Sequence, residues 1–316
     1  MSQSNQVLIT GAHGMVGSAL KTLLPKARTP PSTELDLTYL DELRQYFHDN
    51  GSEIELVYHL AAKVGGVKAN SQSNAAFFNV NTLINTNLLE TCRCFDVPKV
   101  VSVMSTCVYP DAPYVSYPLT ETQLHNGPPH PSNFGYAYAK RMLDVQSRAI
   151  REQYGLDYVT VIPNNIYGPN DLYTKGQSHV IPALVRKVFE ARESNAPTIE
   201  VWGDGTALRE FTYSKDIAKI LVKVAEDYNS PEPLNIGNTE EVSIRELVTL
   251  ICDTLGYKGT VMWNTSEPSG QARKPTSNAN LLSLGLWDKK SYTPLHQGIK
   301  ETCDWFEASY PNIRGF

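Results

Sequence analysis

The first half of the chain alternates short apolar runs with longer amphipathic stretches. The apolar runs are rich in Val, Ile and Tyr, as buried strands are, and span residues 6–10, 54–62, 99–106 and 157–169. The amphipathic stretches have helical spacing and span residues 15–24, 74–96 and 137–154. Strands that alternate with helices of this length form βαβ units, with parallel strands and helices on both faces. The pattern therefore predicts an α/β fold with a doubly wound parallel sheet of the Rossmann type.

The pattern is looser in the second half of the chain. Gly, Pro and Asn cluster at residues 164–170 and 229–238, which marks loops. Residues 243–257 predict a helix, and the spacing of Ser243 and Glu246 predicts a capping box at its start. This half is therefore expected to form a smaller α/β domain that binds the substrate.

The boundary between the two domains is expected to be discontinuous. The segment from about 209 to 237 is predicted to return to the first domain. The first domain then comprises residues 1–167 with that return, and the second comprises residues 168–208 and 238–316.

Composition excludes several classes of protein. The chain has 316 residues with 41% hydrophobic and 19% charged residues, which is typical of a globular protein with a sizeable core. Its formal net charge is −5 and no Lys/Arg block occurs, so nucleic acid is not an expected partner. We expect no signal peptide and no membrane span. The five cysteines are odd in number and lack zinc-ligand spacing, so we predict no metal site and a reducing, cytoplasmic location.

A glycine-rich turn follows the first predicted strand. Its glycines permit a tight turn, a close approach of a pyrophosphate and close packing of helix on strand. The helix amino terminus that follows offers free N–H groups to phosphates. We therefore predict a dinucleotide site formed by Gly11, Ala12, His13, Gly14, Met15, Val16 and Gly17.

Two residues further on bear on which dinucleotide is bound. Asp36 lies 19 residues past Gly17, near the distance at which an acidic residue binds a ribose 2′-OH. Arg28 lies where a second strand should end, and a guanidinium there would bind a 2′-phosphate and favour NADP(H). The alternatives are that Asp36 only lines the adenine pocket and that Arg28 is a solvated surface residue.

Tyr136 and Lys140 are four residues apart on a predicted helix, so both side chains share one face. A phenol with a pKa near 10 is a poor acid–base catalyst at neutral pH, and an adjacent ammonium is expected to lower that pKa. Ser105, at the end of a predicted buried strand, can supply a second hydrogen bond to the same substrate oxygen. Together with the glycine turn, these residues predict a dehydrogenase or reductase.

The motifs named so far, with "HLAA" and "PNNIYGP", resemble the extended short-chain dehydrogenase/reductase superfamily in its nucleotide-sugar branch. Within that branch, "STCVYP", "SHVIPAL" and "VWGDG" followed by "REFTYSKDIA" resemble the GDP-L-fucose synthase family. The resemblance runs from about residue 6 to residue 310. It implies NADPH-dependent conversion of GDP-4-keto-6-deoxy-D-mannose (GDP-4-dehydro-6-deoxy-D-mannose) by 3,5-epimerisation and then 4-reduction. It also implies a homodimer that packs two helices from each subunit.

The resemblance also assigns roles to residues. It makes Cys107 the base of the epimerisation and His179 its acid. It adds to the cofactor site Ala61, Ala62, Met104, Ser105, Lys140, Pro163, Asn164, Asn165, Ile166 and His179. It places the GDP-sugar on Lys187, Trp202, Arg209 and Ser269, although Ser269 stands where the family often has aspartate, which puts its contribution in doubt.

The chemistry of the implied substrate is compatible with these roles. The protons on C3 and C5 are both α to the C4 ketone, and removal of either gives an enolate that Tyr136 and Ser105 would stabilise. A thiolate is a reasonable base and a histidine a reasonable acid. The blander alternatives are that Cys107 is a small buried apolar residue and that His179 is a loop or capping residue.

Two rival functions stay open at this level. One is another nucleotide-sugar enzyme of the same fold, a 4-epimerase or 4,6-dehydratase, although "STCVYP" offers no carboxylate before Asp111. The other is a non-catalytic NADP-binding redox sensor, although such proteins usually lose the tyrosine or the lysine. Both are present here.

Overall fold

The computed structural model describes residues 6–267 and 271–315. Within them, five parallel strands form the main sheet in the order β1-β2-β3-β4-β8. The strands are β1 (Val7–Thr10), β2 (Leu56–His59), β3 (Lys99–Val103), β4 (Asp157–Pro163) and β8 (Leu234–Ile236). This confirms the predicted Rossmann-type sheet. The second strand expected near Arg28 is reduced to a single bridge between Arg28 and Leu8.

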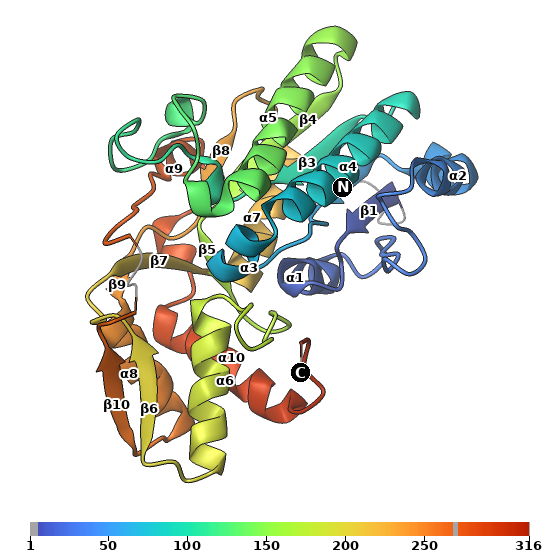
Figure 1. The fold of residues 1–316 in the computed structure, drawn as a ribbon. Coiled ribbons are helices and arrows are strands. Elements are labelled where there is room, and N and C mark those ends of the chain that lie inside the picture. The colour runs from blue at the N-terminus through green and yellow to red at the C-terminus, as the bar shows by residue number, and fades with distance from the viewer. Residues whose placement is uncertain (1–5, 268–270, 316) are drawn as a thin grey trace.

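Helices cover both faces of this sheet (Figure 1). The helices of this half are α1 (Met15–Leu23), α2 (Leu40–Asn50), α3 (Val67–Gln72), α4 (Asn74–Cys94), α5 (Phe134–Tyr154) and α7 (Ser214–Asp227). Alternate residues of each strand enter different cores: Leu8 packs with residues of α4 and α5, whereas Ile9 packs with residues of α7. This is the period-two pattern of a strand buried on both faces, and it explains why these runs are continuously apolar.

The second half of the chain forms its own core beneath the sheet (Figure 1). Its strands pair as β6 (Thr198–Trp202) with β10 (Thr260–Asn264), and as β5 (Asn165–Tyr167), β7 (Leu208–Tyr213) and β9 (Glu241–Ser243). Its helices are α6 (Val180–Glu193), α8 (Ile244–Leu255), α9 (Ala279–Ser283) and α10 (Leu295–Ser309). The predicted capping box is confirmed, because the Ser243 and Glu246 side chains each accept a backbone N–H of the other.

The chain returns to the first sheet after β7. Helix α7 packs on α1, and β8 adds to the sheet beside β4, with Ile162 opposite Asn235. Leu281 of α9 and Tyr292 lie beyond the return segment in the sequence, but they pack in the core between the main sheet and α7. The division into two domains stays a prediction, which these contacts support for the return segment.

Short turns of 3₁₀ helix lie in the loops between these strands and helices. They are Gly51–Glu53, Thr106–Val108, Glu121–Gln123, Pro131–Asn133 and Lys289–Ser291. Among the described residues, the search for a helix of sufficient length and apolarity to cross a membrane finds none.

Candidate active site

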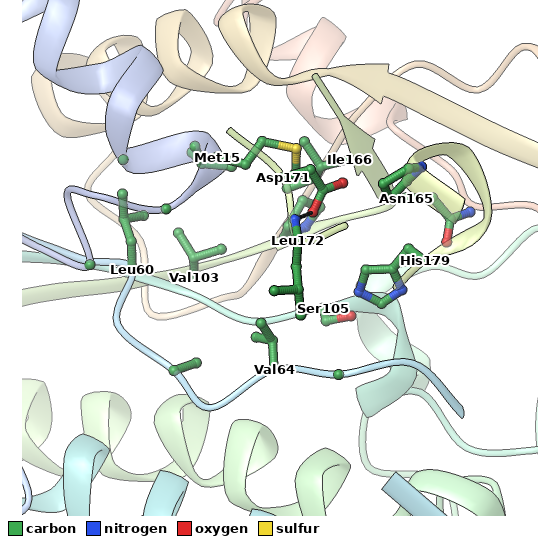
Figure 2. A pocket seen from close by; sticks show the side chains of 18 of the residues that line it. Met15, Leu60, Val64, Val103, Ser105, Asn165, Ile166, Asp171, Leu172 and His179 are labelled. Atoms are coloured by element: carbon green, nitrogen blue, oxygen red, sulfur yellow. Dashed lines mark hydrogen bonds between the residues drawn. The ribbon is translucent and has the colours of Figure 1, made fainter. Parts of the chain in front are cut away.

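A pocket of about 330 Å³ opens at the carboxyl ends of β1, β3 and β4 and reaches the start of α6. Figure 2 shows Met15 and Leu60 toward one end of it, near the glycine turn, and His179 and Asn165 toward the other. Ligands of open parallel sheets bind in this position, outside the carboxyl ends of the strands. The pocket joins the first half of the chain to the second.

The glycine turn has the geometry that a phosphate cradle requires. Gly11 has φ +69°, and a Cβ there would lie 2.8 Å from the backbone nitrogen of Ala61. A Cβ on Gly17 would lie 2.2 Å from the carbonyl oxygen of Gly11, so a side chain is excluded there. Gly14 donates its N–H to that carbonyl at 3.0 Å and forms the N-cap of α1 without a side-chain bond. The backbone N–H groups that follow Gly14 are thus left for an anion, and the residues present fit a dinucleotide.

Most of the predicted cofactor residues meet in this pocket. Those that line it are Gly11, Gly14, Met15, Val16, Gly17, Ala61, Ala62, Met104, Ser105, Lys140, Pro163, Asn164, Asn165, Ile166 and His179. Those that do not line it are Ala12, His13, Arg28 and Asp36.

The side chains of Arg28 and Asp36 already have partners within the protein. The guanidinium of Arg28 donates to Asn50 Oδ1 at 2.8 Å and pairs with Glu53. Asp36 Oδ1 accepts the N–H of Thr38 at 2.9 Å and its hydroxyl at 2.8 Å, which closes a turn. Their roles toward a cofactor stay predictions.

Lys140 is held at the floor of the pocket. It is 2% exposed, and its Nζ donates to the carbonyl oxygen of Val103 at 2.8 Å. Burial lowers the pKa of Lys140 to about 8, and the neighbouring Cys107 acts in the opposite direction. The ammonium is therefore fixed in place by the end of β3 without any ligand.

Tyr136 lines the same pocket, one helical turn before Lys140. Burial raises the pKa of the phenol, and the nearby Cys107 raises it further. The expected lowering of this pKa by Lys140 is therefore wrong for this pocket. Burial disfavours the charged phenolate, so the group is a phenol poised to donate a proton.

Cys107 lies just behind Ser105, in the short 3₁₀ turn after β3. Its N–H donates to Ser105 Oγ at 3.5 Å, and its side chain does not line the pocket. Burial raises the pKa of the thiol, whereas Ser105 and the charges of Lys274 and Lys140 lower it. The thiol thus has two cations close by that would favour a thiolate.

His179 and Asp171 both line the pocket, and the charge of His179 acts on Asp171. His179 precedes α6 as its N-cap residue and makes no side-chain capping bond. Asp171 is 6% exposed, and its Oδ1 accepts the N–H of Leu172 at 2.7 Å (Figure 2). Burial raises the pKa of Asp171, and the charges of His179 and Arg314 act in the opposite direction. Its Oδ2 is buried without a hydrogen-bond partner among the described residues.

The histidine of "HLAA" is structural. His59 contacts Thr10 Oγ1 at 3.1 Å and Asn85 Oδ1 at 3.0 Å, and Asn85 in turn donates to the carbonyl of Ala139 at 2.9 Å. Burial lowers the pKa of His59 to about 3, with a smaller contribution from Lys140. The neutral imidazole therefore links β1 and β2 to α4 directly, and to α5 through Asn85.

The residues predicted to bind the GDP-sugar lie outside this pocket. Lys187 is exposed and donates to the carbonyl of Glu200 at 2.6 Å, and Trp202 is 55% exposed. Arg209 is partly buried beside Lys274, and burial lowers the pKa of both groups. Ser269 lies outside the described residues.

Sequence reasoning missed three residues here: Asp171, Lys274 and Arg314. Asp171 follows the quoted "YGP" by two positions, which is a usable signal. Lys274 and Arg314 carry no local signal, because only the tertiary fold brings them near Cys107 and the glycine turn. No cluster of three His, Cys, Asp or Glu side chains suited to a metal is found in residues 6–267 and 271–315.

Comparison with known proteins gives consistent matches. Residues 7–237 match the NAD dependent epimerase/dehydratase family. The chain is 41% identical to a GDP-L-fucose synthase from Dictyostelium discoideum, over 98% of this chain and 97% of that protein. It is 36% identical to the GDP-L-fucose synthase of Escherichia coli K12, over 98% and 99% of the two chains. The crystal structure of a GDP-L-fucose synthetase from Naegleria fowleri bound to NADP superposes with a TM-score of 0.89, at 37% identity, and covers 98% of this chain and 94% of that one.

Proposed function

The chain belongs to the NAD dependent epimerase/dehydratase family, among the GDP-L-fucose synthases, and on this basis we propose that it makes GDP-L-fucose from GDP-4-keto-6-deoxy-D-mannose with NADPH. The observation that carries the proposal is one pocket that joins Ser105, Tyr136 and Lys140 to His179, with Cys107 directly behind Ser105. Reduction alone would need only the first three of these residues.

The cofactor site is proposed to run from the glycine turn to Lys140. The N–H groups after Gly14 bind the pyrophosphate, and Lys140 binds at the nicotinamide end, where Val103 fixes it. NADPH supplies the hydride that reduces C4. Val103 gives that end of the pocket an apolar wall, and Met15 and Leu60 line the pocket toward the glycine turn.

Tyr136 and Ser105 are proposed to bind the C4 oxygen throughout the reaction. Because burial keeps Tyr136 protonated, its O–H donates to the oxygen when negative charge develops there. In the epimerisations that charge belongs to an enolate, and in the reduction it belongs to an alkoxide. One pair of donors therefore serves both reactions, and in the reduction Tyr136 finally gives its proton to the alkoxide.

Cys107 and His179 are proposed to move the protons on C3 and C5. Cys107, whose thiolate form Lys274 and Lys140 favour against the larger opposing effect of burial on its pKa, removes the proton, and His179 returns one to the opposite face. The two groups come from opposite halves of the chain, the turn after β3 and the start of α6. That placement supports action on two faces of one sugar ring.

Arg209 and Lys274 are proposed to bind the pyrophosphate of the GDP-sugar. The two cations are partly buried and burial lowers the pKa of each, and the charge of Arg209 lowers the pKa of Lys274 further while Cys107 and Asp111 act in the opposite direction. A doubly charged pyrophosphate relieves the repulsion between the two cations. Lys187 and the exposed ring of Trp202 are proposed to contact the nucleoside, and the alternative for Trp202 is an anchor of the second core.

The rival functions are less well supported. A 4-epimerase or 4,6-dehydratase has no use for a thiol on which the charges of two lysines act, and a redox sensor has no use for an intact Tyr136 and Lys140 in a formed pocket. Specific loss of proton exchange on removal of Cys107 is the result that separates these functions.

A homodimer is proposed through α4 and α5, which lie side by side (Figure 1). Met142 and Val145 of α5 are exposed by 38% and 55%, and Leu83 of α4 is exposed by 47%. Apolar residues on two adjacent helices suit a four-helix contact with a second copy. We also propose a cytoplasmic location, since the five cysteines are all free thiols.

The test is incubation with GDP-4-keto-6-deoxy-D-mannose and NADPH in deuterated water, with the product identified by NMR. The wild type should consume NADPH, give GDP-L-fucose and carry deuterium at C3 and C5. Cys107→Ser should still consume NADPH, but should give a 6-deoxyhexose of unchanged C3 and C5 configuration with almost no deuterium. Cys94→Ser, which removes an exposed cysteine on α4, is the matched control and should behave as wild type. Deuterium at both carbons at the wild-type rate in Cys107→Ser would remove the thiol from the mechanism.

A further inference from the structure

The side chain of Arg314 lies at the glycine turn although its backbone belongs to the other half of the chain. Its Nη1 is 3.6 Å from the position that a Cβ on Gly14 would occupy, and its side chain lines the same pocket as Gly11 and Gly17. Figure 1 shows the chain after α10 turning from the second core toward α1. A cation therefore stands directly before the N-terminus of α1.

The backbone that carries Arg314 is firmly held. Its carbonyl oxygen accepts the N–H of Tyr173 at 2.9 Å, and the carbonyl of Gly315 accepts from Arg186 Nη1 at 3.2 Å. Gly315 has φ +84°, and a Cβ there would lie 2.1 Å from Thr174 Oγ1, so the chain can follow this path only with glycine. Ile313 is 7% exposed and anchors the segment in the second core. The position of Arg314 is thus determined by the fold.

The guanidinium has no hydrogen bond or ion pair of its own within the part of the chain that the structure describes. Its charge acts on Asp171, whose buried Oδ2 lacks a hydrogen-bond partner among the described residues. An exposed arginine on a fixed backbone and a buried carboxylate oxygen without a partner thus line one pocket, and the protein alone leaves this region electrostatically incomplete. The N–H groups of α1 favour an anion at the same point.

We propose that Arg314 binds the pyrophosphate of the dinucleotide, opposite the N–H groups that follow Gly14. A guanidinium can donate two parallel hydrogen bonds to a phosphate, so the pyrophosphate would be held by backbone on one side and by Arg314 on the other. Asp171 makes no hydrogen bond or ion pair with Arg314 among the described residues and acts on it only through its charge, so the guanidinium donors stay available to a phosphate. The cofactor is then held by both halves of the chain. This inference rests on the cofactor part of the proposed function and is independent of the sugar.

The test measures binding of NADPH and of NADH in the absence of any sugar, by nicotinamide fluorescence, for wild type, Arg314→Ala, Arg314→Lys and Lys258→Ala. Because the pyrophosphate is common to both cofactors, Arg314→Ala should raise both Kd values by about tenfold or more and leave their ratio unchanged. Arg314→Lys should be intermediate, since a lysine keeps the charge and loses the fork. Lys258→Ala removes an exposed cation that does not line the pocket and should change neither value.

Thermal unfolding separates binding from folding. Ligand-free Arg314→Ala should unfold at the wild-type temperature, and the rise in Tm on addition of NADPH should shrink. If that variant unfolds earlier without ligand, Arg314→Gln, which keeps a polar side chain without the charge, takes its place in the comparison. Unchanged Kd values for both cofactors would overturn the proposal, and so would a loss confined to NADPH, which would place the contact at the 2′-phosphate. Absence of NADPH binding by the wild type would instead refute the proposed cofactor.

Discussion

The region around β1, β3 and α5 and the region around α6, β6 and β7 organise their functional groups in opposite ways. In the first, Lys140 is 2% exposed and tied to a carbonyl, and the glycine turn is fixed by contacts that admit no side chain. In the second, Trp202 is 55% exposed, and Lys187 is an exposed residue whose Nζ bonds a strand carbonyl. The first region is therefore organised before a ligand arrives, and the second is completed by the ligand.

This difference predicts that substitutions in the two regions will affect different properties of the protein. Changes in the first region should act on the chemical step or on the fold, and changes in the second should act on substrate affinity. Each prediction below can break or refine that division.

The largest effect is expected for Tyr136→Phe. The ring and its packing on Phe77 remain, but the proton donor to the C4 oxygen is lost, so kcat should fall by about 10²–10³. The Kd for NADPH should stay nearly unchanged. A stopped-flow record of NADPH consumption with the keto-sugar measures the loss of rate. A fluorescence titration measures the Kd for NADPH. Oxidation at a near wild-type rate would show that the donor is misassigned.

A smaller effect of a different kind is expected for Arg209→Ala. Loss of one charged bond to the sugar nucleotide should cost about 1.5–3 kcal/mol and raise KM by about 10–150-fold, with kcat little changed. Steady-state kinetics in the keto-sugar give both parameters. A drop in kcat with an unchanged KM would contradict the division between the two regions.

Acid should destabilise the protein through His59. In the unfolded chain this histidine has its ordinary pKa near 6.5, whereas burial holds the folded pKa at about 3. The unfolded state therefore binds a proton first, so the stability that is present above pH 6.5 is lost as the pH falls. From pH 6.5 to 5.0 the loss should be about 2 kcal/mol. Urea unfolding at both pH values measures it, and His59→Gln should flatten the dependence.

The smallest effect is expected for Arg28→Ala. A wild-type preference for NADPH over NADH of about tenfold should largely disappear if the guanidinium binds the 2′-phosphate. Because Glu53 and Asn50 already engage that guanidinium, Glu53→Gln should increase the preference. Kd values for both cofactors test this, and an unchanged ratio in Arg28→Ala would leave Arg28 as a surface residue.

The sequence predicted the groups whose geometry is local. The glycine turn, the four-residue spacing of Tyr136 and Lys140, and the capping box at Ser243 depend on neighbours within one or two turns, so a pattern can encode them. The alternation of strands and helices likewise predicted the parallel sheet, since every strand of it is buried on both faces.

The remaining features are tertiary. The raised pKa of Tyr136 depends on burial by distant segments, and no spacing reports burial. Lys274 lies near Cys107, and Arg314 lies near Gly14. In each pair the two residues are separated in the sequence by more than half the length of the chain. Local patterns carry no record of such contacts, so these residues were visible only in the structure.

The place of β8 beside β4 has a consequence for synthesis of the protein. Roughly 70 residues separate the end of β4 from the start of β8, which at about 5–20 residues per second take the ribosome about 4–14 s to add. During that interval β4 is an uncovered sheet edge, and the core that awaits Ile217 and Leu221 is incomplete. In the nascent chain, α5 with Tyr136 and Lys140 is thus complete while the edge of β4 is still unpaired. In that interval the chain most needs protection by a chaperone.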